Sequence, residues 1–163
     1  MGAEELIEVG MAELKVAANP HVLTTRGLGS CLGITLYDPL KKIGGLAHPM
    51  LPDINNSRAK PNPARFVNSC LDEMIKELTN FGCLKNRLQA KVFGGAHMFS
   101  FISQDSAFSV GEKNIDMAFR ALSNYNIPIV AEDIRGNFGR TIEFDLTSGA
   151  VRIRTLYFGE KTV

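Results

Sequence analysis

Short β-prone runs separated by turn residues are the feature that most limits how this chain can fold. Over residues 141–146, apolar and polar side chains alternate, which is the pattern of a strand with one buried face. Because most of the runs are close neighbours in the sequence, we expect antiparallel or mixed sheets. The other expected strands lie at residues 4–9, 12–18, 22–25, 31–37, 43–47, 89–93, 127–132 and 151–158.

Turn residues between the runs predict hairpins. Gly10 separates the first two runs, so residues 4–18 are expected to form an opening strand pair. Residues 38–42 begin with Asp-Pro and are expected to close another hairpin, and residues 147–149 turn the chain into a C-terminal one. The sequence therefore predicts strands that pair largely with their neighbours.

Two stretches have helical spacing instead. In residues 62–82, Asn62 can cap the N-terminus, Pro63 suits the first turn and Gly82 ends the apolar repeat. Residues 111–125 have the same spacing. Each helix has one apolar stripe, so each should lie on a sheet with its other side in water. The stripes are Val67, Cys70, Leu71, Met74, Leu78 and Phe81 in the first helix, and Ile115, Ala118, Phe119 and Leu122 in the second.

These elements predict a single α+β domain over residues 1–163. We expect two stacked sheets, mixed or antiparallel, in a sandwich-like arrangement, with the two amphipathic helices packed outside. A chain of 163 residues can bury such a core without a second domain.

Charge and hydropathy exclude several classes of protein. The net charge is +1 and no long basic run occurs, so nucleic acid is not an expected partner. Apolar stretches are far shorter than the roughly 20 residues that span a bilayer, and the first residues lack a signal-peptide pattern. We therefore expect a cytoplasmic protein without membrane insertion.

The cysteines and histidines do not indicate a metal site. Three cysteines without a Cys-x-x-Cys pair, and three scattered histidines, match neither a disulfide framework nor zinc-ligand spacing. We expect no metal and no cofactor. Cys70 lies on the first helical stripe and is expected to be a buried thiol, while Cys83 and His97 are expected to have structural or incidental roles.

A glycine-rich turn around Cys31 is where we expect the chemistry. Gly27, Gly29 and Gly33 surround Cys31, and glycine lets a backbone turn tightly and approach a ligand closely. The hairpin that follows should return His48 to the neighbourhood of Cys31. A cysteine beside a histidine can act as an activated nucleophile.

Several separated motifs carry a family resemblance. They are Thr25-x-Gly27-Leu28-Gly29-Ser30-Cys31, His48 followed by Met50-Leu51-Pro52, Phe93-Gly94-Gly95-Ala96-x-Met98-Phe99, and Glu132-Asp133-Ile134-x-Gly136-x-x-Gly139-Arg140. Together they resemble CheD, the chemoreceptor glutamine deamidases of bacterial and archaeal chemotaxis, over about residues 9–155. In one departure, Arg135 stands where the family usually has a glycine.

The resemblance implies a function and a catalytic set. Cys31, His48 and Thr25 match the family's catalytic Cys, His and Thr, with Thr25 orienting the imidazole. The implied activity is deamidation of glutamine side chains in methyl-accepting chemoreceptors, by a protein recruited to receptor arrays in the cytoplasm. Hydrolysis of glutamate methyl esters would use the same steps.

The expected reaction passes through a thioester. Cys31 would attack the glutamine carboxamide, and His48 would first take the thiol proton and then protonate the departing ammonia. Backbone N–H groups around Ser30 would hold the oxyanion, with Gly29 and Gly95 completing the substrate-binding backbone. Ser30 is a poorer nucleophile than Cys31, because a thiol ionises far more readily than a hydroxyl.

Other readings stay open. The protein could act as a regulatory module that binds the CheC-type phosphatase of the response regulator, which family members do, or as a transglutaminase using the same thioester. Residues 51–63 form a polar, proline-punctuated loop that serves either as a connector or as a determinant of specificity. Asp133, Asn137 and Arg140 are either turn residues or substrate contacts.

Overall fold

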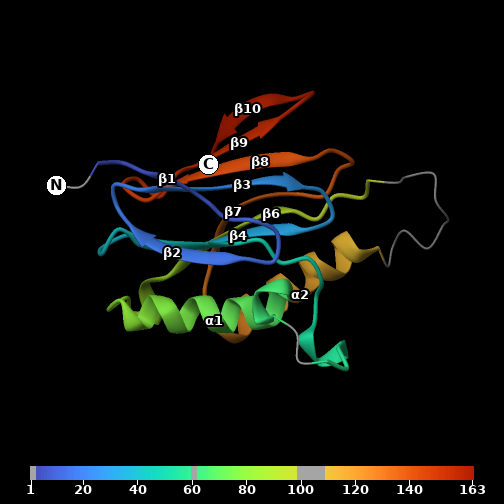
Figure 1. The fold of residues 1–163 in the computed structure, drawn as a ribbon, viewed down its shortest axis with the longest axis horizontal. Coiled ribbons are helices and arrows are strands. Elements are labelled where there is room, and N and C mark those ends of the chain that lie inside the picture. The colour runs from blue at the N-terminus through green and yellow to red at the C-terminus, as the bar shows by residue number, and fades with distance from the viewer. Residues whose placement is uncertain (1–2, 60–61, 99–108) are drawn as a thin grey trace.

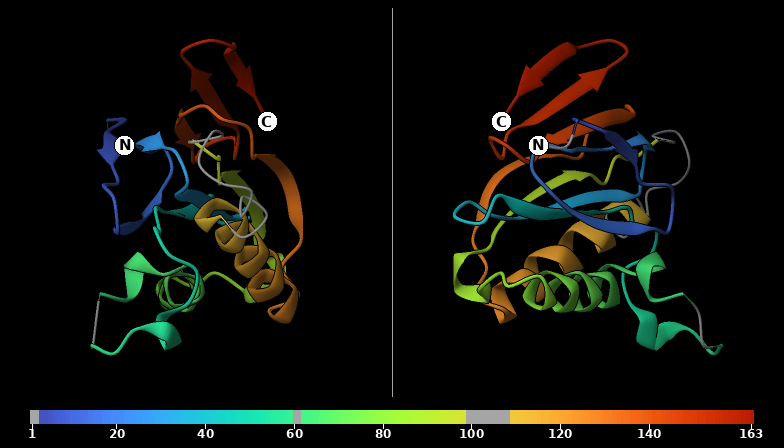
Figure 2. Two further views of the ribbon diagram at one scale, coloured as in Figure 1. Left: turned by 90° about the vertical axis from the view of Figure 1, so that its right-hand side faces the viewer. Right: turned by 60° about the vertical axis from the view of Figure 1, so that its left-hand side comes forward.

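Two five-stranded sheets lie face to face, and the helices cover the outer face of one of them (Figures 1 and 2). The structure is a computed structural model and describes residues 3–59, 62–98 and 109–163. Phe99 of the expected glycine-rich motif, and residues 60–61 of the polar loop, lie outside these ranges. The predicted α+β sandwich with external helices is confirmed.

The strands divide between the sheets as follows. The first sheet has the order β1-β3-β8-β9-β10, with bounds Leu6–Glu8, Val22–Leu28, Arg140–Asp145, Val151–Thr155 and Gly159–Thr162. The second sheet has the order β2-β5-β4-β6-β7, with bounds Leu14–Ala18, Ile43–Ala47, Leu32–Asp38, Gln89–Gly94 and Ile129–Ile134. Both sheets are mixed, because β1 runs parallel to β3 and β6 runs parallel to β7.

The expected hairpins are partly confirmed. β4 pairs with β5, and β8 with β9, in antiparallel register. The last strand is shorter than expected, since β9 ends at Thr155 and the chain turns into β10. Arg152 and Arg154 lie on the solvated face of the first sheet, where both pair with Glu143.

The opening strand pair is a wrong prediction. β1 joins β3 in the first sheet, whereas β2 joins β5 in the second. Val9 packs in the core between the sheets, while Leu14 and Val16 pack on the helical side of the second sheet. Alternation identified both runs as strands, but the apolar faces that they bury against different layers decided their partners.

The helices are α1, Val67–Asn80, and α2, Val110–Asn124. Asn62 caps a short 3₁₀ turn rather than α1, because the extended residue Phe66 interrupts the helix and bridges to Leu51. The expected end is confirmed by Gly82, whose φ of +92° lies in the left-handed region that glycine tolerates. Cys70 is fully buried on α1, as expected.

Two apolar clusters fill the spaces between the three layers. One joins the helices to the second sheet and includes Leu32, Ile34 and Leu36 of β4; the other lies between the sheets. Alternation along β4 sends successive side chains to opposite clusters. Cys31, just before β4, belongs to the cluster between the sheets.

Candidate active site

The β4–β5 hairpin places Cys31 and His48 on the same face of the second sheet. Ile34 pairs with Ala47, and the Leu32 N–H donates to the Pro49 carbonyl at 3.2 Å, so the pairing continues past both strand ends. In this register His48 lies opposite Gly33. Cys31 is two residues from Gly33 and therefore diagonal to His48 on that face, within side-chain reach.

Backbone hydrogen bonds from the residues after β6 hold the turn at residues 29–31, which is called the cysteine turn below. The Gly95 N–H donates to the Cys31 carbonyl at 3.0 Å, and the Ala96 N–H donates to the Gly29 carbonyl at 2.9 Å. Gly94 has φ +97°, and a Cβ there would lie 2.3 Å from the Cys31 carbonyl oxygen. Only glycine permits this approach, so the Gly-Gly-Ala sequence shapes the turn that carries the thiol.

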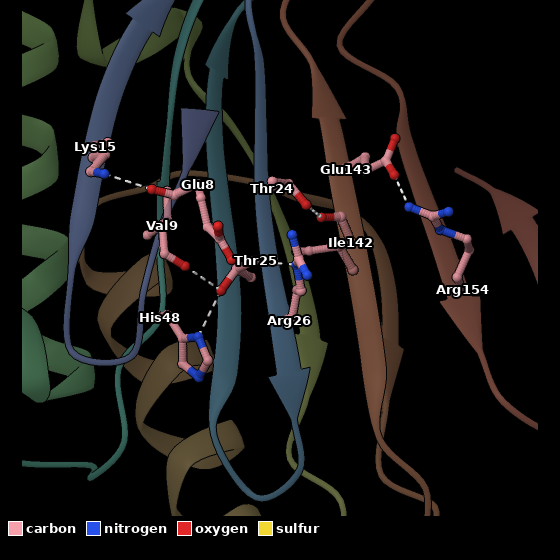
Figure 3. A network of polar contacts seen from close by, with 10 residues as sticks. All are labelled: Glu8, Val9, Lys15, Thr24, Thr25, Arg26, His48, Ile142, Glu143 and Arg154. Atoms are coloured by element: carbon pink, nitrogen blue, oxygen red, sulfur yellow. Dashed lines mark hydrogen bonds and ion pairs between the residues drawn. The ribbon is translucent and has the colours of Figure 1, made fainter. Parts of the chain in front are cut away.

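Thr25 of β3 reaches across from the first sheet to His48 (Figure 3). Its Oγ1 lies 2.7 Å from His48 Nδ1 and donates its proton to the Val9 carbonyl at 2.7 Å. A hydroxyl has one proton, so Thr25 must accept from a protonated Nδ1. This arrangement leaves the Nε2 lone pair of a neutral His48 available as a base.

Burial keeps both members of the Cys–His pair uncharged. It raises the pKa of the Cys31 thiol, an effect partly opposed by the residue's own backbone N–H, and it lowers the pKa of His48. His48 Nε2 is buried and has no hydrogen-bond partner among the described residues. The site therefore combines a neutral thiol with a neutral imidazole whose proton-accepting nitrogen is unoccupied within the described parts of the chain.

The backbone N–H groups near Cys31 differ in what they bind. The N–H groups of Gly29 and Gly95 donate to carbonyls within the turn, those of Gly27 and Cys31 respectively. The N–H groups of Ser30 and Cys31 have no backbone acceptor within residues 3–59, 62–98 and 109–163. Donors of this kind are suited to an oxyanion.

Comparisons with known proteins identify the family. The family described as CheD chemotactic sensory transduction matches residues 50–155, and relatives extend the similarity over nearly the whole chain. This chain belongs to the CheD family. A probable chemoreceptor glutamine deamidase CheD of Desulforamulus reducens is 47% identical over 92% of this chain and 90% of its own length. The chemoreceptor glutamine deamidase CheD of Halalkalibacterium halodurans is 41% identical over 98% of this chain and 99% of its own.

A solved structure gives a weaker similarity. The Bacillus licheniformis hypothetical protein YfiH aligns with 74% of this chain and 49% of its own, with 13% identity and a TM-score of 0.44. Neither fold nor function follows from a similarity at this level.

The loop at Arg135 and Gly136 has a left-handed backbone. Arg135 has φ +71° and Gly136 φ +78°, and the Arg135 N–H donates to the Gly94 carbonyl at 2.9 Å. The Arg135 side chain pairs with Glu112 of α2 at 2.5 Å. The arginine therefore occupies a left-handed position that usually favours glycine.

The other residues of that loop have structural contacts. Arg140 is buried, donates to Asp133 at 3.1 Å and lies 4.4 Å from the Phe138 ring centroid. Asn137 is exposed on the rim of a pocket of about 790 Å³ on the outer face of the first sheet. The Arg140–Asp133 pair joins β8 of the first sheet to β7 of the second, and neither Arg140 nor Asn137 contacts Thr25 or His48 among the hydrogen bonds and ion pairs of the described residues.

The sequence did not identify two residues that contact the Cys–His segments. Val9 accepts from Thr25 through its carbonyl, and Asn114 donates from its side chain to the Ser30 and Met50 carbonyls. Val9 contributes a carbonyl that any residue could supply, so it left no signal. Asn114 is a polar residue on the apolar stripe of α2, one turn before Ala118, and that anomaly was the available signal.

The described residues indicate neither a metal site nor a membrane-spanning helix. No three His, Cys, Asp or Glu side chains among them lie close enough to hold a metal ion. None of the helices in the same ranges is long and apolar enough to cross a bilayer.

Proposed function

We propose that this protein is a protein-glutamine deamidase that converts glutamine side chains of chemoreceptors to glutamate. The observation that carries the proposal is the hydrogen-bond relay from Val9 through Thr25 to His48, which leaves Nε2 as a base on the face that carries Cys31. The relatives named as chemoreceptor glutamine deamidases support the choice of substrate.

The reaction begins with a neutral pair. Nε2 of His48 takes the thiol proton as Cys31 Sγ bonds to the carboxamide carbon, because burial disfavours a standing thiolate. The tetrahedral intermediate collapses with cleavage of the C–N bond, and His48 gives its proton to the departing ammonia. Water, deprotonated by His48, then hydrolyses the thioester and restores the thiol.

The oxyanion donors are the N–H groups of Ser30 and Cys31. Both adjoin the nucleophile and have no backbone acceptor in the described chain. Gly29 and Gly95 use their N–H groups to shape the turn, so they contribute to substrate binding through the backbone path that they fix. A glutamate methyl ester could enter the same cycle with methanol as leaving group.

An intact-mass assay tests the proposal. A cytoplasmic receptor fragment incubated with wild-type protein should gain about one dalton per modified glutamine and release ammonia, whereas Cys31→Ala should give neither. Cys83→Ala is the matched control and should retain activity, since Cys83 is also buried but belongs to the cluster between the helices and the second sheet. Absence of a mass gain with folded wild-type protein and several receptors would contradict the proposal.

The alternative function, a regulatory module that binds a CheC-type phosphatase, separates from deamidation in the same variant. Cys31→Ala should retain phosphatase binding if that association also occurs, because only the thiol is removed. Cross-linked product in place of ammonia would instead indicate transglutamination.

A further inference from the structure

The side chain of Asn114 joins the two segments that carry Cys31 and His48. It lies in the first turns of α2, is fully buried, and donates from Nδ2 to the Ser30 carbonyl at 3.0 Å and to the Met50 carbonyl at 3.1 Å. Both protons of the amide group are thereby used. One side chain of a helix thus fixes the residue before the thiol and the residue two positions after the imidazole.

The bond to Ser30 has a directional consequence for Cys31. In a planar trans peptide, the carbonyl of one residue and the N–H of the next point in opposite directions. Because Asn114 holds the Ser30 carbonyl toward α2, the Cys31 N–H points away from α2. The same N–H opposes the effect of burial on the pKa of the Cys31 thiol, so it acts on the residue's own Sγ, the atom that would bond to the substrate carbonyl carbon.

The position of Asn114 is itself fixed by close backbone contact. A Cβ on Gly111, one turn earlier in α2, would lie 2.7 Å from the Gly95 carbonyl oxygen and 2.9 Å from that of Ala96. The start of α2 therefore rests directly on the backbone that holds the cysteine turn. This contact leaves little freedom for the amide of Asn114 to move relative to Ser30.

The Asn114 side chain also carries a cost, because it buries an amide oxygen. Its Oδ1 is buried without a partner among the described residues, which costs about 1–3 kcal/mol for a typical buried polar group. An apolar residue of similar size would avoid that cost. Such a residue could not, however, donate the two hydrogen bonds to Ser30 and Met50.

We propose that Asn114 is a positioning residue that aims the Cys31 N–H at the developing oxyanion by holding the Ser30–Cys31 peptide plane. This inference rests on the proposed role of Cys31 as nucleophile. It assigns Asn114 no contact with substrate, and it predicts that Asn114 matters for acyl transfer more than for the reactivity of the thiol itself.

Two reactions of Cys31 separate these effects without any receptor. Acylation by 4-nitrophenyl acetate forms an S–C bond through a tetrahedral oxyanion and releases 4-nitrophenolate. Alkylation by iodoacetamide forms an S–C bond with loss of iodide and has no oxyanion. Both products are assigned to Cys31 by peptide mass, and both rates are measured for wild-type protein, Asn114→Leu and the exposed control Asn124→Leu at the other end of α2.

We expect Asn114→Leu to lower acylation by on the order of 10²-fold, the effect of losing one oxyanion donor, while alkylation stays near the wild-type rate. Asn124→Leu should change neither. If Asn114→Leu does not fold, as judged by circular dichroism, the smaller Asn114→Ala removes the same two donors without adding bulk or charge. Unchanged acylation in a folded variant, or acylation and alkylation falling together, would overturn the proposal.

Receptor deamidation measured on the same samples keeps the two proposals distinct. A wild-type protein that acylates readily at Cys31 but leaves receptor glutamines unchanged would refute the deamidase function alone. A lowered ratio of acylation to alkylation in the Asn114 variant would still support the role of Asn114.

Discussion

The two ends of β4 each bring a buried cysteine close to an ionisable side chain, but they differ in how their polar atoms are satisfied. At the start of β4, Cys31 lies diagonal to His48, whose Nε2 has no partner among the described residues. At its end, Asp38 is fully buried and accepts hydrogen bonds from Arg87 at 2.8–3.1 Å and from the N–H groups of Leu40 and Lys41.

The pKa directions follow the same difference. Burial alone would raise the pKa of Asp38, but Arg87 and the backbone donors outweigh it and hold that pKa below its usual range. Cys83 nearby has a pKa raised to about 11 by burial and then by the Asp38 charge, so it stays an inert thiol. A cysteine in a fully satisfied polar cluster is structural, whereas one beside an unpartnered base can react.

Of the substitutions at the two ends of β4, replacing His48 should reduce deamidation activity most. His48→Gln removes the proton acceptor, and we expect kcat for receptor deamidation to fall by about 10²–10⁴-fold. His21→Gln, at a histidine whose Nδ1 accepts from the Glu5 N–H, is the control. Comparable activity of His48→Gln and wild type would mean that another group deprotonates Cys31.

Removing the imidazole's partner should have a smaller effect. Thr25→Val cannot accept from Nδ1, and we expect kcat to fall about 10–100-fold, as when an imidazole loses the group that orients it. Thr24→Val is matched, because Thr24 donates to the Ile142 carbonyl on the opposite face of the same strand (Figure 3). Equal losses in both variants would assign the effect to the fold rather than to the relay.

The pH dependence distinguishes a neutral pair from an ion pair. With His48 neutral and its pKa lowered by burial, deamidation should be lost only as pH falls below about 6.5, the ordinary histidine value. Alkylation of Cys31 by iodoacetamide should be slow at pH 6 and rise toward the raised thiol pKa. Fast, pH-independent alkylation between pH 5 and 6 would indicate a standing thiolate–imidazolium pair instead.

The opposite end of β4 should affect stability and not chemistry. Asp38→Asn leaves the donors of Arg87 poorly matched, and we expect the free energy of unfolding at pH 7 to fall by about 1–3 kcal/mol, with kcat unchanged. Because the folded-state pKa of Asp38 is lowered, its contribution is present above the unfolded pKa and lost as pH falls through the folded one. Urea unfolding should therefore show a larger difference between variant and wild type at pH 7 than at pH 3.

Much of the fold followed from local patterns. Period-two alternation and turn residues located most strands, and the apolar stripes located both helices. The predicted hairpin also explains why Cys31 and His48 share a face, since their register follows from the β4–β5 turn alone. The start of α1 was missed because Phe66, although apolar, takes an extended conformation to bridge Leu51.

The contacts between the two sheets could not be predicted from local sequence patterns. The family resemblance suggested that Thr25 orients His48, but no local pattern places a β3 side chain against the end of β5. Val9 was missed together with the wrong pairing of β1 and β2, because its carbonyl reaches Thr25 only when β1 lies beside β3.

The sequence by itself determined most of the strands and both helices, and it determined that one hairpin brings the strand ends with the thiol and the imidazole near each other. These properties depend on neighbouring residues, through backbone sterics and side-chain periodicity. Only the tertiary structure decided the tautomer of His48, the burial that keeps Cys31 and His48 neutral, and the hydrogen bond from Asn114 to the Ser30 carbonyl. Those properties depend on groups far apart in the chain, which meet only when the apolar faces of the three layers are buried together.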